Sequence, residues 1–511
     1  MPASRPARVL VALAAAALTL SACSAEPDRG DDPTVTQVGP DAAPGSSVPA
    51  GLEEYYGQEL TWEACGDFEC AEATVPLDYE APDGESITLA LKRLSSDDDA
   101  RVGSLLINPG GPGSSALDLV EAAPAMFGAD LLAAYDVVGF DPRGVGDSTA
   151  IDCVSDAELD RLRSASYDTE TDEGLRAYRA DSELIADGCA EGSGDLVAHV
   201  DTVSAARDMD VLRHLLGEER LDYLGFSYGT FLGATYADLF PEQVGNLVLD
   251  GAMDPSLDSH QMTLDQAIGF EEALRAYVAD CQAGSECPLT GDVDGGVEQV
   301  QTLLELTGDT PLPTASDRDL TASLALSGIL LPLYDSTTWF VLTAALEQAM
   351  NERDGSQLLF LADLMASREA DGTYSSNSTE ANWAINCLDH PSTGDLADWE
   401  VQADELAEAA PTFGPALSYG GMLCDSWPAE GVDAGALTAA GSAPIMVVGT
   451  TGDPATPYQW SVSLAEQLEN GFLVTYEGEG HTAYGRSNDC IAGAVEDFLI
   501  HGTVPEEGLT C

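Results

Sequence analysis

Basic side chains are scarce in this sequence: 511 residues include 19 Lys and Arg against 89 Asp and Glu, and Lys92 is the only lysine. The formal net charge at pH 7 is -70. A protein that binds nucleic acid needs basic groups to neutralise phosphates, so this composition weighs strongly against nucleic acid as a partner. Such an acidic surface favours solubility, and salt would screen its self-repulsion.

The apolar segment at residues 9–20 is too short to span a bilayer as a helix. It follows Arg5 and Arg8, and this layout of basic residues before a short apolar run is typical of a signal peptide. We therefore expect residues 1–22 to be a signal peptide that directs export.

The segment ends in the residues LSAC, which resemble the lipobox of bacterial lipoproteins. That resemblance implies cleavage before Cys23 and attachment of diacylglycerol to its thiol. Residues 23–50 are rich in Asp, Pro, Gly and Ser, so they predict a flexible tether. We expect a lipoprotein at the outer face of the cytoplasmic membrane, and plain secretion after cleavage at the Ala-rich site is the alternative.

Metal-binding cysteine patterns are also missing. The sequence has no Cys-x-x-Cys pair and no Cys/His cluster of zinc spacing, so we expect neither a metal site nor a cofactor. Apart from Cys23, ten cysteines remain, and an even number in an exported chain indicates disulfides. Sequence alone does not fix their connectivity. Sequential pairing would close five short or moderate loops: Cys65–Cys70, Cys153–Cys189, Cys281–Cys287, Cys387–Cys424 and Cys490–Cys511.

Short apolar runs alternate with helical patterns from residue 104 to residue 250, and the alternation resumes at residue 444. This alternation is typical of βαβ units and predicts an α/β fold with a mostly parallel sheet. Residues 256–427 are different, because they indicate helices joined by polar turns. We expect one sheet domain, built from residues 51–255 and 428–511, that is interrupted after its sixth strand by a helical cap.

Ser227 lies in the pattern Gly-x-Ser-x-Gly, which carries little weight by itself because serine and glycine are common in turns. Its placement is more specific, since an apolar strand precedes it and a helical pattern follows. This context predicts a nucleophile on a sharp strand-to-helix turn. A side chain at Gly225 or Gly229 would crowd the neighbouring backbone there.

A serine nucleophile needs a histidine base and an acid that orients the base. His481 follows an apolar strand on a Gly-rich loop, and Asp453 lies on the corresponding loop after the preceding strand. The chain order Ser227, Asp453, His481 is one that a large class of serine hydrolases uses. The other five histidines belong to expected helices, their flanks or the helical insertion: His199, His214, His260, His390 and His501.

The oxyanion that forms during such a reaction needs two N–H donors. One expected donor is the backbone N–H of Tyr228, at the start of the helix after Ser227. The second should come from the Gly-rich loop at residues 108–113, where Gly110 and Gly111 are both candidates.

Eight motifs together resemble one known family: the secreted tripeptidyl aminopeptidases of actinobacteria, which are relatives of prolyl iminopeptidases with the α/β-hydrolase fold. In chain order they are CAEATVPLDY (70–79), NPGGPGSS (108–115), GFDPRGVGDS (139–148), GFSYGT (225–230), NWAINCLD (382–389), CDSWP (424–428), GDPATP (452–457) and GEGHTAY (478–484). One departure is Ala116, where the family pattern has glycine.

The resemblance implies an exopeptidase that cleaves peptides near a free N-terminus, of the tripeptidyl or prolyl aminopeptidase type. Sequence does not fix the oligomeric state, and a monomer is the expectation. Family members bind the ammonium group of the substrate with carboxylates from the cap, and Asp389 is the candidate here. Two other functions fit the same sequence. One is a carboxylesterase or lipase with an apolar lid, and the other is a noncatalytic surface-binding lipoprotein, against which the intact Ser, Asp and His argue.

Overall fold

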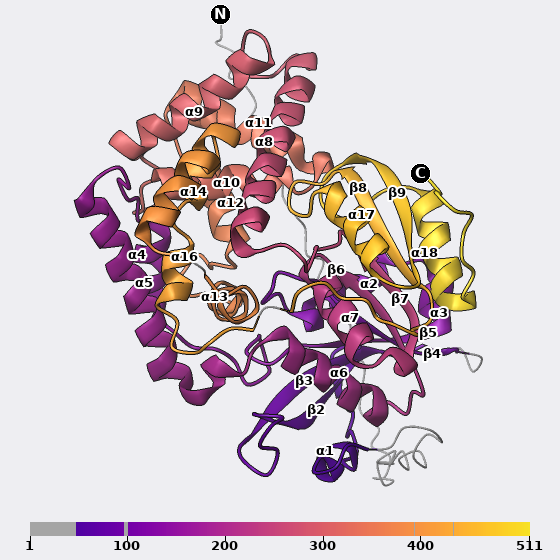
Figure 1. Cartoon of the computed structure of the whole chain (residues 1–511). Helices are drawn as coiled ribbons and strands as arrows, with labels where there is room; N and C mark the ends of the chain where they lie inside the picture. The colour runs from indigo at the N-terminus through magenta and orange to yellow at the C-terminus, as the bar shows by residue number, and fades with distance from the viewer. Residues whose placement is uncertain (1–47, 97–100, 393, 433) are drawn as a thin grey trace, which may run out of the picture. The chain divides into compact units, whose positions relative to one another are not determined.

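The computed structural model describes residues 48–96, 101–392, 394–432 and 434–511. The predicted signal peptide, Cys23 and the tether as far as residue 47 lie outside these ranges. The described strands form one nine-stranded sheet (Figure 1). In sheet order they are β1 (Glu63–Cys65), β2 (Phe68–Pro76), β3 (Ser86–Leu94), β5 (Tyr135–Phe140), β4 (Gly103–Asn108), β6 (Leu221–Phe226), β7 (Val244–Asp250), β8 (Ile445–Gly452) and β9 (Gly471–Glu479).

The sheet is mostly parallel, as the sequence predicts. Strands β4 to β9 are parallel to one another, whereas β1, β2 and β3 pair antiparallel with each other and β3 pairs antiparallel with β5. The parallel strands are apolar on both faces because helices cover both faces. One face carries α6 (Thr202–Leu215), α7 (Tyr228–Leu239) and α17 (Tyr458–Gln467), and the other carries α2 (Ala116–Met126), α3 (Ala129–Ala134) and α18 (Asp489–His501).

A helical segment lies between β7 and β8 in the chain and has its own apolar core, formed mainly by α8 to α12. Its helices are α8 (Ser259–Ala283), α9 (Val293–Asp309), α10 (Ala322–Leu333), α11 (Trp339–Glu347), α12 (Ser356–Met365), α13 (Ser378–Asp389), α14 (Leu396–Ala409), α15 (Gly414–Leu417) and α16 (Gly421–Asp425). The expected position after the sixth strand is wrong by one. The segment follows the seventh strand, β7. The edge strand β1 has three residues, none of them buried, so its sequence carries no apolar pattern.

Two helices from the first part of the chain pack on this cap. They are α4 (Asp156–Ser164) and α5 (Asp172–Ser193), and Figure 1 shows them beside α13, α14 and α16. Ion pairs join them to the cap. Arg368 Nε of the cap lies 2.6 Å from Oδ1 of Asp160 on α4, and Arg179 Nη1 on α5 lies 3.3 Å from Oδ2 of Asp425 in the cap. The cap therefore packs against helices that precede it in the chain as well as against the sheet domain.

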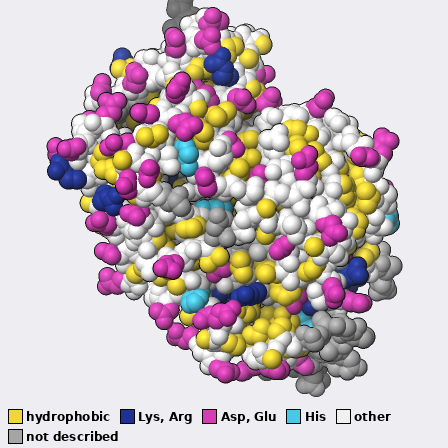
Figure 2. All heavy atoms as spheres, in the orientation of Figure 1, with side chains coloured by type: hydrophobic (Ala, Val, Ile, Leu, Met, Phe, Trp, Pro, Cys, Tyr) yellow, Lys and Arg dark blue, Asp and Glu magenta, His cyan; other side chains and the backbone are white. Residues whose placement is uncertain are grey.

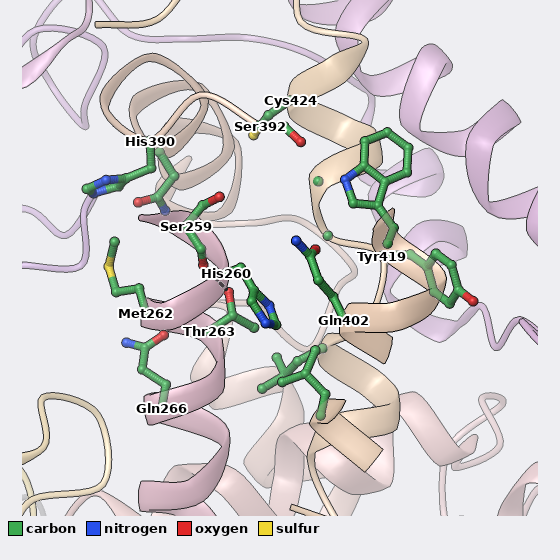
Figure 3. A pocket seen from close by; sticks show the side chains of 16 residues that line it. Ser259, His260, Met262, Thr263, Gln266, His390, Ser392, Gln402, Tyr419 and Cys424 are labelled. Atoms are coloured by element: carbon green, nitrogen blue, oxygen red, sulfur yellow. Dashed lines mark hydrogen bonds between the residues drawn. The ribbon is translucent and has the colours of Figure 1, made fainter. Parts of the chain in front are cut away.

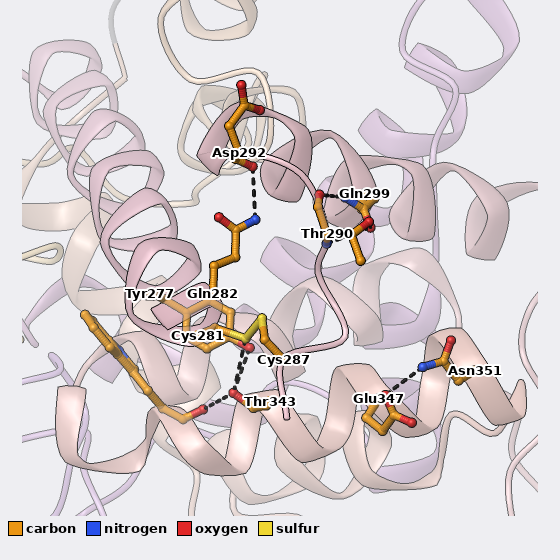
Figure 4. Close-up of a disulfide and its surroundings, with 11 residues drawn as sticks. Tyr277, Cys281, Gln282, Cys287, Thr290, Asp292, Gln299, Thr343, Glu347 and Asn351 are labelled. Carbon is orange, nitrogen blue, oxygen red and sulfur yellow. Dashed lines mark hydrogen bonds between the residues drawn. A yellow bond between two sulfur atoms is a disulfide. The ribbon is translucent and has the colours of Figure 1, made fainter. Parts of the chain in front are cut away.

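All five disulfides expected from sequential pairing are present in the structure. Cys281–Cys287 closes the end of α8 onto the following loop, beside the Tyr277 and Thr343 hydroxyls (Figure 4). Cys490–Cys511 joins the start of α18 to the C-terminal residue.

Acidic side chains are spread over the face of the molecule in Figure 2, and Lys and Arg are few there. Many of the arginines pair with carboxylates, and the Arg143–Asp208 pair is fully buried, with 2.7 Å between the charged groups. No helix in the described ranges is long and apolar enough to cross a membrane.

Candidate active site

The residues expected to carry chemistry lie where neighbouring parallel strands end. Ser227 follows β6 directly, Asp453 follows β8, and His481 comes two residues after β9. Since β4, β6, β7, β8 and β9 are parallel and adjacent in this order, their carboxyl ends meet at one edge of the sheet. Open α/β sheets bind their ligands at this edge.

Ser227 occupies the sharp turn between β6 and α7, with φ 54° and ψ -125°. A positive φ is unfavourable for a serine, so surrounding contacts must stabilise it. The Ser227 N–H donates to the carbonyl oxygen of Asp250 at 2.9 Å. A Cβ at Gly225 would lie 2.3 Å from the carbonyl oxygen of Gly229, so neither strand nor helix leaves room for a side chain there. The turn has the strand–turn–helix form that the sequence predicts.

Two backbone segments approach Ser227. The N–H of Tyr228, at the first position of α7, has no acceptor within the helix. The loop after β4 is so close that a Cβ at Gly110 would lie 2.8 Å from Ser227 Cβ. The Gly110 N–H donates to Asn108 Oδ1 at 2.9 Å, whereas Gly111 lines the cavity that contains Ser227. These contacts favour Gly111 over Gly110 as the second oxyanion donor.

His481 and Asp453 form a hydrogen-bonded pair. His481 Nδ1 lies 2.9 and 3.0 Å from the two carboxylate oxygens of Asp453. A proton on Nδ1 satisfies this contact and leaves Nε2 as the basic nitrogen. The Asp453 carboxylate is buried and also accepts the N–H groups of Ala455 and Thr456, at 3.0 and 2.9 Å. From the cap, the backbone carbonyl oxygen of Tyr334 accepts the backbone N–H of His481 at 2.7 Å, so the cap holds the main chain at His481 while Asp453 orients the imidazole.

A second buried carboxylate, Asp250 at the end of β7, joins the nucleophile turn to the histidine loop. Its side chain accepts the N–H groups of Ala483 and Tyr484, at 3.0 and 2.7 Å, while its carbonyl oxygen accepts the Ser227 N–H. Burial raises the pKa of Asp250 to about 6. The carboxylate makes no hydrogen bond to His481 in the described residues, so it shapes the backbone rather than the base.

Ser227 and His481 line the same cavity, which has a volume of about 530 Å³. The Ser227 hydroxyl and His481 are not hydrogen bonded to each other in the described part of the chain, and this contact often tightens only when substrate binds. The cap supplies much of the opposite wall, including Gln266, Tyr334, Met365, Asn382 and Trp383. None of the described residues that line the cavity is Asp or Glu.

Asp389 does not line this cavity, and its position argues against the predicted contact with a substrate amino group. It is buried at the end of α13, where its carboxylate accepts the N–H and the hydroxyl of Thr202, at 2.8 and 2.6 Å. The Thr202 hydroxyl also contacts the Tyr228 hydroxyl. Burial raises the pKa of Asp389 to about 7. Asp389 therefore links the cap to Thr202 on α6 and, through the Thr202 hydroxyl, to Tyr228 at the start of α7.

Known proteins are similar to this chain in sequence. Residues 410–511 match the family model described as TAP-like protein. Serine protease Hip1 of Mycobacterium tuberculosis is 37% identical over 489 residues, which cover 90% of this chain and 92% of that protein. This chain belongs to the TAP-like family of α/β-hydrolases. The resemblance and the fold class expected from the motifs are confirmed, and the chain is a serine hydrolase.

Other TAP-like relatives have different names at similar identity. The tripeptidyl aminopeptidase of Streptomyces coelicolor is 32% identical over 469 residues, 88% of this chain and 86% of that protein. Carboxylesterase B of Mycobacterium tuberculosis is 36% identical over 524 residues, 98% of this chain and 96% of that protein. Identity at this level therefore does not choose between peptide and ester substrates.

Sequence patterns did not single out Thr456 or Tyr334. The Thr456 hydroxyl lies 3.1 Å from Asp453 Oδ2 and 3.3 Å from His481 Nδ1. Its place in the motif GDPATP, three residues after Asp453, was the available signal. Tyr334 lies after α10 in the cap, and its contact with His481 depends on how the cap folds, so no local pattern reveals it.

Proposed function

We propose that the protein is a serine peptidase in which Ser227 is the nucleophile, His481 the base and Asp453 the acid that orients the base. The observation that carries this proposal is the His481–Asp453 hydrogen bond beside a cavity that also contains Ser227. Asp453 fixes the tautomer of His481 and stabilises the imidazolium that forms during the reaction.

In the proposed mechanism, His481 Nε2 takes the hydroxyl proton of Ser227 while the serine oxygen bonds to the scissile carbonyl carbon. The carbonyl electron pair moves onto oxygen, and the N–H groups of Tyr228 and Gly111 stabilise the oxyanion. The oxyanion then collapses, the C–N bond breaks, and His481 gives its proton to the leaving amine. Water, deprotonated by His481, then attacks the acyl carbon. The bond between this carbon and the Ser227 oxygen breaks, His481 returns the proton to that oxygen, and the acid is released.

More specifically, we propose that the peptidase cleaves near a free N-terminus, and a relative named tripeptidyl aminopeptidase supports this substrate choice. A second candidate is hydrolysis of blocked peptides or esters. It is favoured by the cavity, whose described lining has no carboxylate to pair with a substrate ammonium group. A relative named carboxylesterase B is consistent with it.

One set of substrates tests both proposals: Ala-Ala-Ala-p-nitroanilide, its N-acetylated form and p-nitrophenyl butyrate. We expect Ser227→Ala to lower kcat by about 10⁴-fold or more on each cleaved substrate, because the acyl-enzyme cannot form. Ser316→Ala, at an exposed serine outside the cavity, is the control. Full turnover by Ser227→Ala would contradict the mechanism. Loss of cleavage on acetylation favours the aminopeptidase, and equal cleavage of the acetylated peptide favours the second candidate.

Export and anchoring form a separate proposal, based on the sequence at residues 1–23. The mature protein would begin at a diacylglyceryl-modified Cys23, and peptides would be cut outside the cytoplasmic membrane. Mass spectrometry of the N-terminal fragment tests this directly. A fragment that begins elsewhere, or that lacks lipid, favours plain secretion.

A further inference from the structure

A second, smaller cavity adjoins the catalytic cavity on the cap side. Its volume is about 260 Å³, and it lies between α8 and α14 (Figure 3). Gln266 lines both cavities. On α13, Asn382 lines the catalytic cavity and Asn386 the second one, and the Asn386 amide donates to Asn382 Oδ1 at 3.1 Å. The two cavities therefore share a wall and one side chain.

Gln266 presents a hydrogen-bond acceptor where the two cavities meet. Its amide nitrogen donates to the carbonyl oxygen of Ala455 at 2.8 Å, which fixes the orientation of the amide group because a carbonyl can only accept. Ala455 is itself fixed, since its N–H donates to Asp453 Oδ1. The amide oxygen of Gln266 then remains to accept an N–H group. A peptide backbone that passes this point supplies such a group.

The second cavity is lined by aromatic and aliphatic side chains with polar groups between them. One of the polar groups, His260, has its Nε2 3.1 Å from Oε2 of Glu405, which does not itself line the cavity. Its apolar members include Trp399, Leu406 and Tyr419, and its polar members include His260 and Gln402. Figure 3 shows His260 on α8 and Gln402 on α14 pointing into the space between the helices. None of the described lining residues is Asp, Glu, Lys or Arg. Such a lining favours an uncharged apolar or aromatic group over an ion.

The size of the second cavity sets the size of its occupant. Cavities that hold complete small-molecule ligands measure roughly 300–1,000 Å³. At about 260 Å³ the second cavity is below this range, although the catalytic cavity beside it is within it. The second cavity is therefore better suited to one side chain of a substrate that also occupies the catalytic cavity than to a separate ligand.

We propose that the second cavity binds an uncharged aromatic or aliphatic side chain of a peptide substrate, remote from the scissile bond, with the connecting backbone bonded to Gln266. This inference rests on the proposed peptidase function. It makes the enzyme selective for peptides that extend beyond the residue next to the cut and that carry an apolar side chain at one remote position.

Two substrate series test the proposal. The first is a set of tetra-alanyl arylamides in which Phe replaces Ala at one position at a time, and the second is a set of internally quenched peptides with the same replacements after the cut. We expect Phe at one remote position to raise kcat/KM at least tenfold over Ala, and the series that responds shows which side of the cut is bound. Equal kcat/KM for Phe and Ala at every remote position would overturn the proposal.

Gln402→Phe fills the second cavity from a partly exposed helix position, so we expect it to abolish the preference for remote Phe. Val401→Phe is the matched control, because Val401 is the next residue on α14, is 67% exposed and does not line the cavity. It should keep the preference. A Gln402→Phe enzyme that still prefers Phe by the same factor contradicts the assignment.

Binding to an inactive protein separates this proposal from the proposed function. In Ser227→Ala, calorimetry should show a Kd at least tenfold lower for the preferred Phe peptide than for its Ala counterpart, and added Gln402→Phe should remove the difference. This difference supports the subsite even if neither substrate series is cleaved, an outcome that would contradict only the peptidase function. No difference in Kd would overturn the subsite.

Discussion

The carboxyl edge of the sheet and the helical cap border the same cavity, but they bring side chains to it in different ways. At the edge, Ser227, Asp453 and His481 each lie within two residues of a strand end, so the hydrogen-bonded sheet fixes their spacing. The cap supplies Gln266 and Tyr334 from helices with a separate apolar core. The edge should therefore set the rate of the chemical step, whereas the cap should set stability and the choice of substrate.

The largest expected effect is at the edge, where two buried carboxylates can be compared directly. Asp453→Asn should lower kcat by about 10⁴-fold, because an amide cannot stabilise the same His481 tautomer and imidazolium. The fold-loss of kcat in Asp250→Asn should be at least ten times smaller than in Asp453→Asn, since Asp250 contacts backbone N–H groups and not the imidazole. Steady-state kinetics and thermal melts of both variants provide the comparison. Equal losses of kcat in two folded variants would break the distinction between the two carboxylates.

The next effect is at the boundary between cap and edge, where Asp389 is buried against Thr202. The pKa of Asp389 is raised to about 7 by burial, above the usual value of about 3.9 in an unfolded chain. A raised pKa means that the folded state binds the proton more tightly, so the contribution to stability is complete below pH 4 and is lost as the pH rises to 7.

Asp389→Asn should remove this part of the pH dependence, because asparagine does not titrate. The unfolding free energy of the wild type, relative to the variant, should fall between pH 4 and pH 7 by about 1.4 kcal/mol per unit of pKa difference. Denaturant unfolding at several pH values measures it. Parallel pH profiles for the two proteins would show that the carboxylate does not titrate in this window.

A smaller effect is expected at Asn377, whose side chain bonds to the loop that follows β5. Asn377 Oδ1 accepts the Gly146 N–H at 2.9 Å, and its amide donates to the carbonyl oxygens of Gly144 and Ile151, both at 2.9 Å. Asn377→Ala should cost about 3 kcal/mol, at about 1 kcal/mol for each lost hydrogen bond. The control is Asn351→Ala, at an exposed cap residue whose side chain has a single hydrogen bond within the described ranges, to Glu347. Denaturant unfolding of both variants tests this, and equal stability would mean that Asn377 does not attach the cap.

The edge could be predicted from the sequence because its information is local. An apolar run followed by a Gly-rich turn identifies each strand end, and parallel strands bring these ends together, which is why the sequence could predict the positions of Ser227, Asp453 and His481 after neighbouring strands. The proposal of Gly111 rather than Gly110 as the second oxyanion donor depends on the Asn108 side chain, which accepts the Gly110 N–H. A glycine pattern does not contain that contact.

The cap was less predictable because its side chains are placed by tertiary packing. Asp389 belongs to a family motif, but the motif does not say whether the carboxylate faces the cavity or the core. The structure places it against Thr202, inside the protein. Gln266 and Tyr334 reach the cavity only because α8 and the end of α10 pack over the sheet edge, and helical periodicity predicts burial without naming the neighbour.

The smallest expected effect is on stability alone, from removal of the Cys281–Cys287 disulfide in the cap. Cys281 and Cys287 close a short loop at the far end of α8, beside Thr343 on α11 (Figure 4). Replacing both by serine should lower the unfolding free energy by roughly 2 kcal/mol, because the unfolded chain loses one short-loop constraint. The kcat on the shortest cleaved arylamide should stay the same, since neither cysteine lines the catalytic cavity. If kcat fell while the thermal melt did not change, the cap would act on the chemical step, and the division between edge and cap would be wrong.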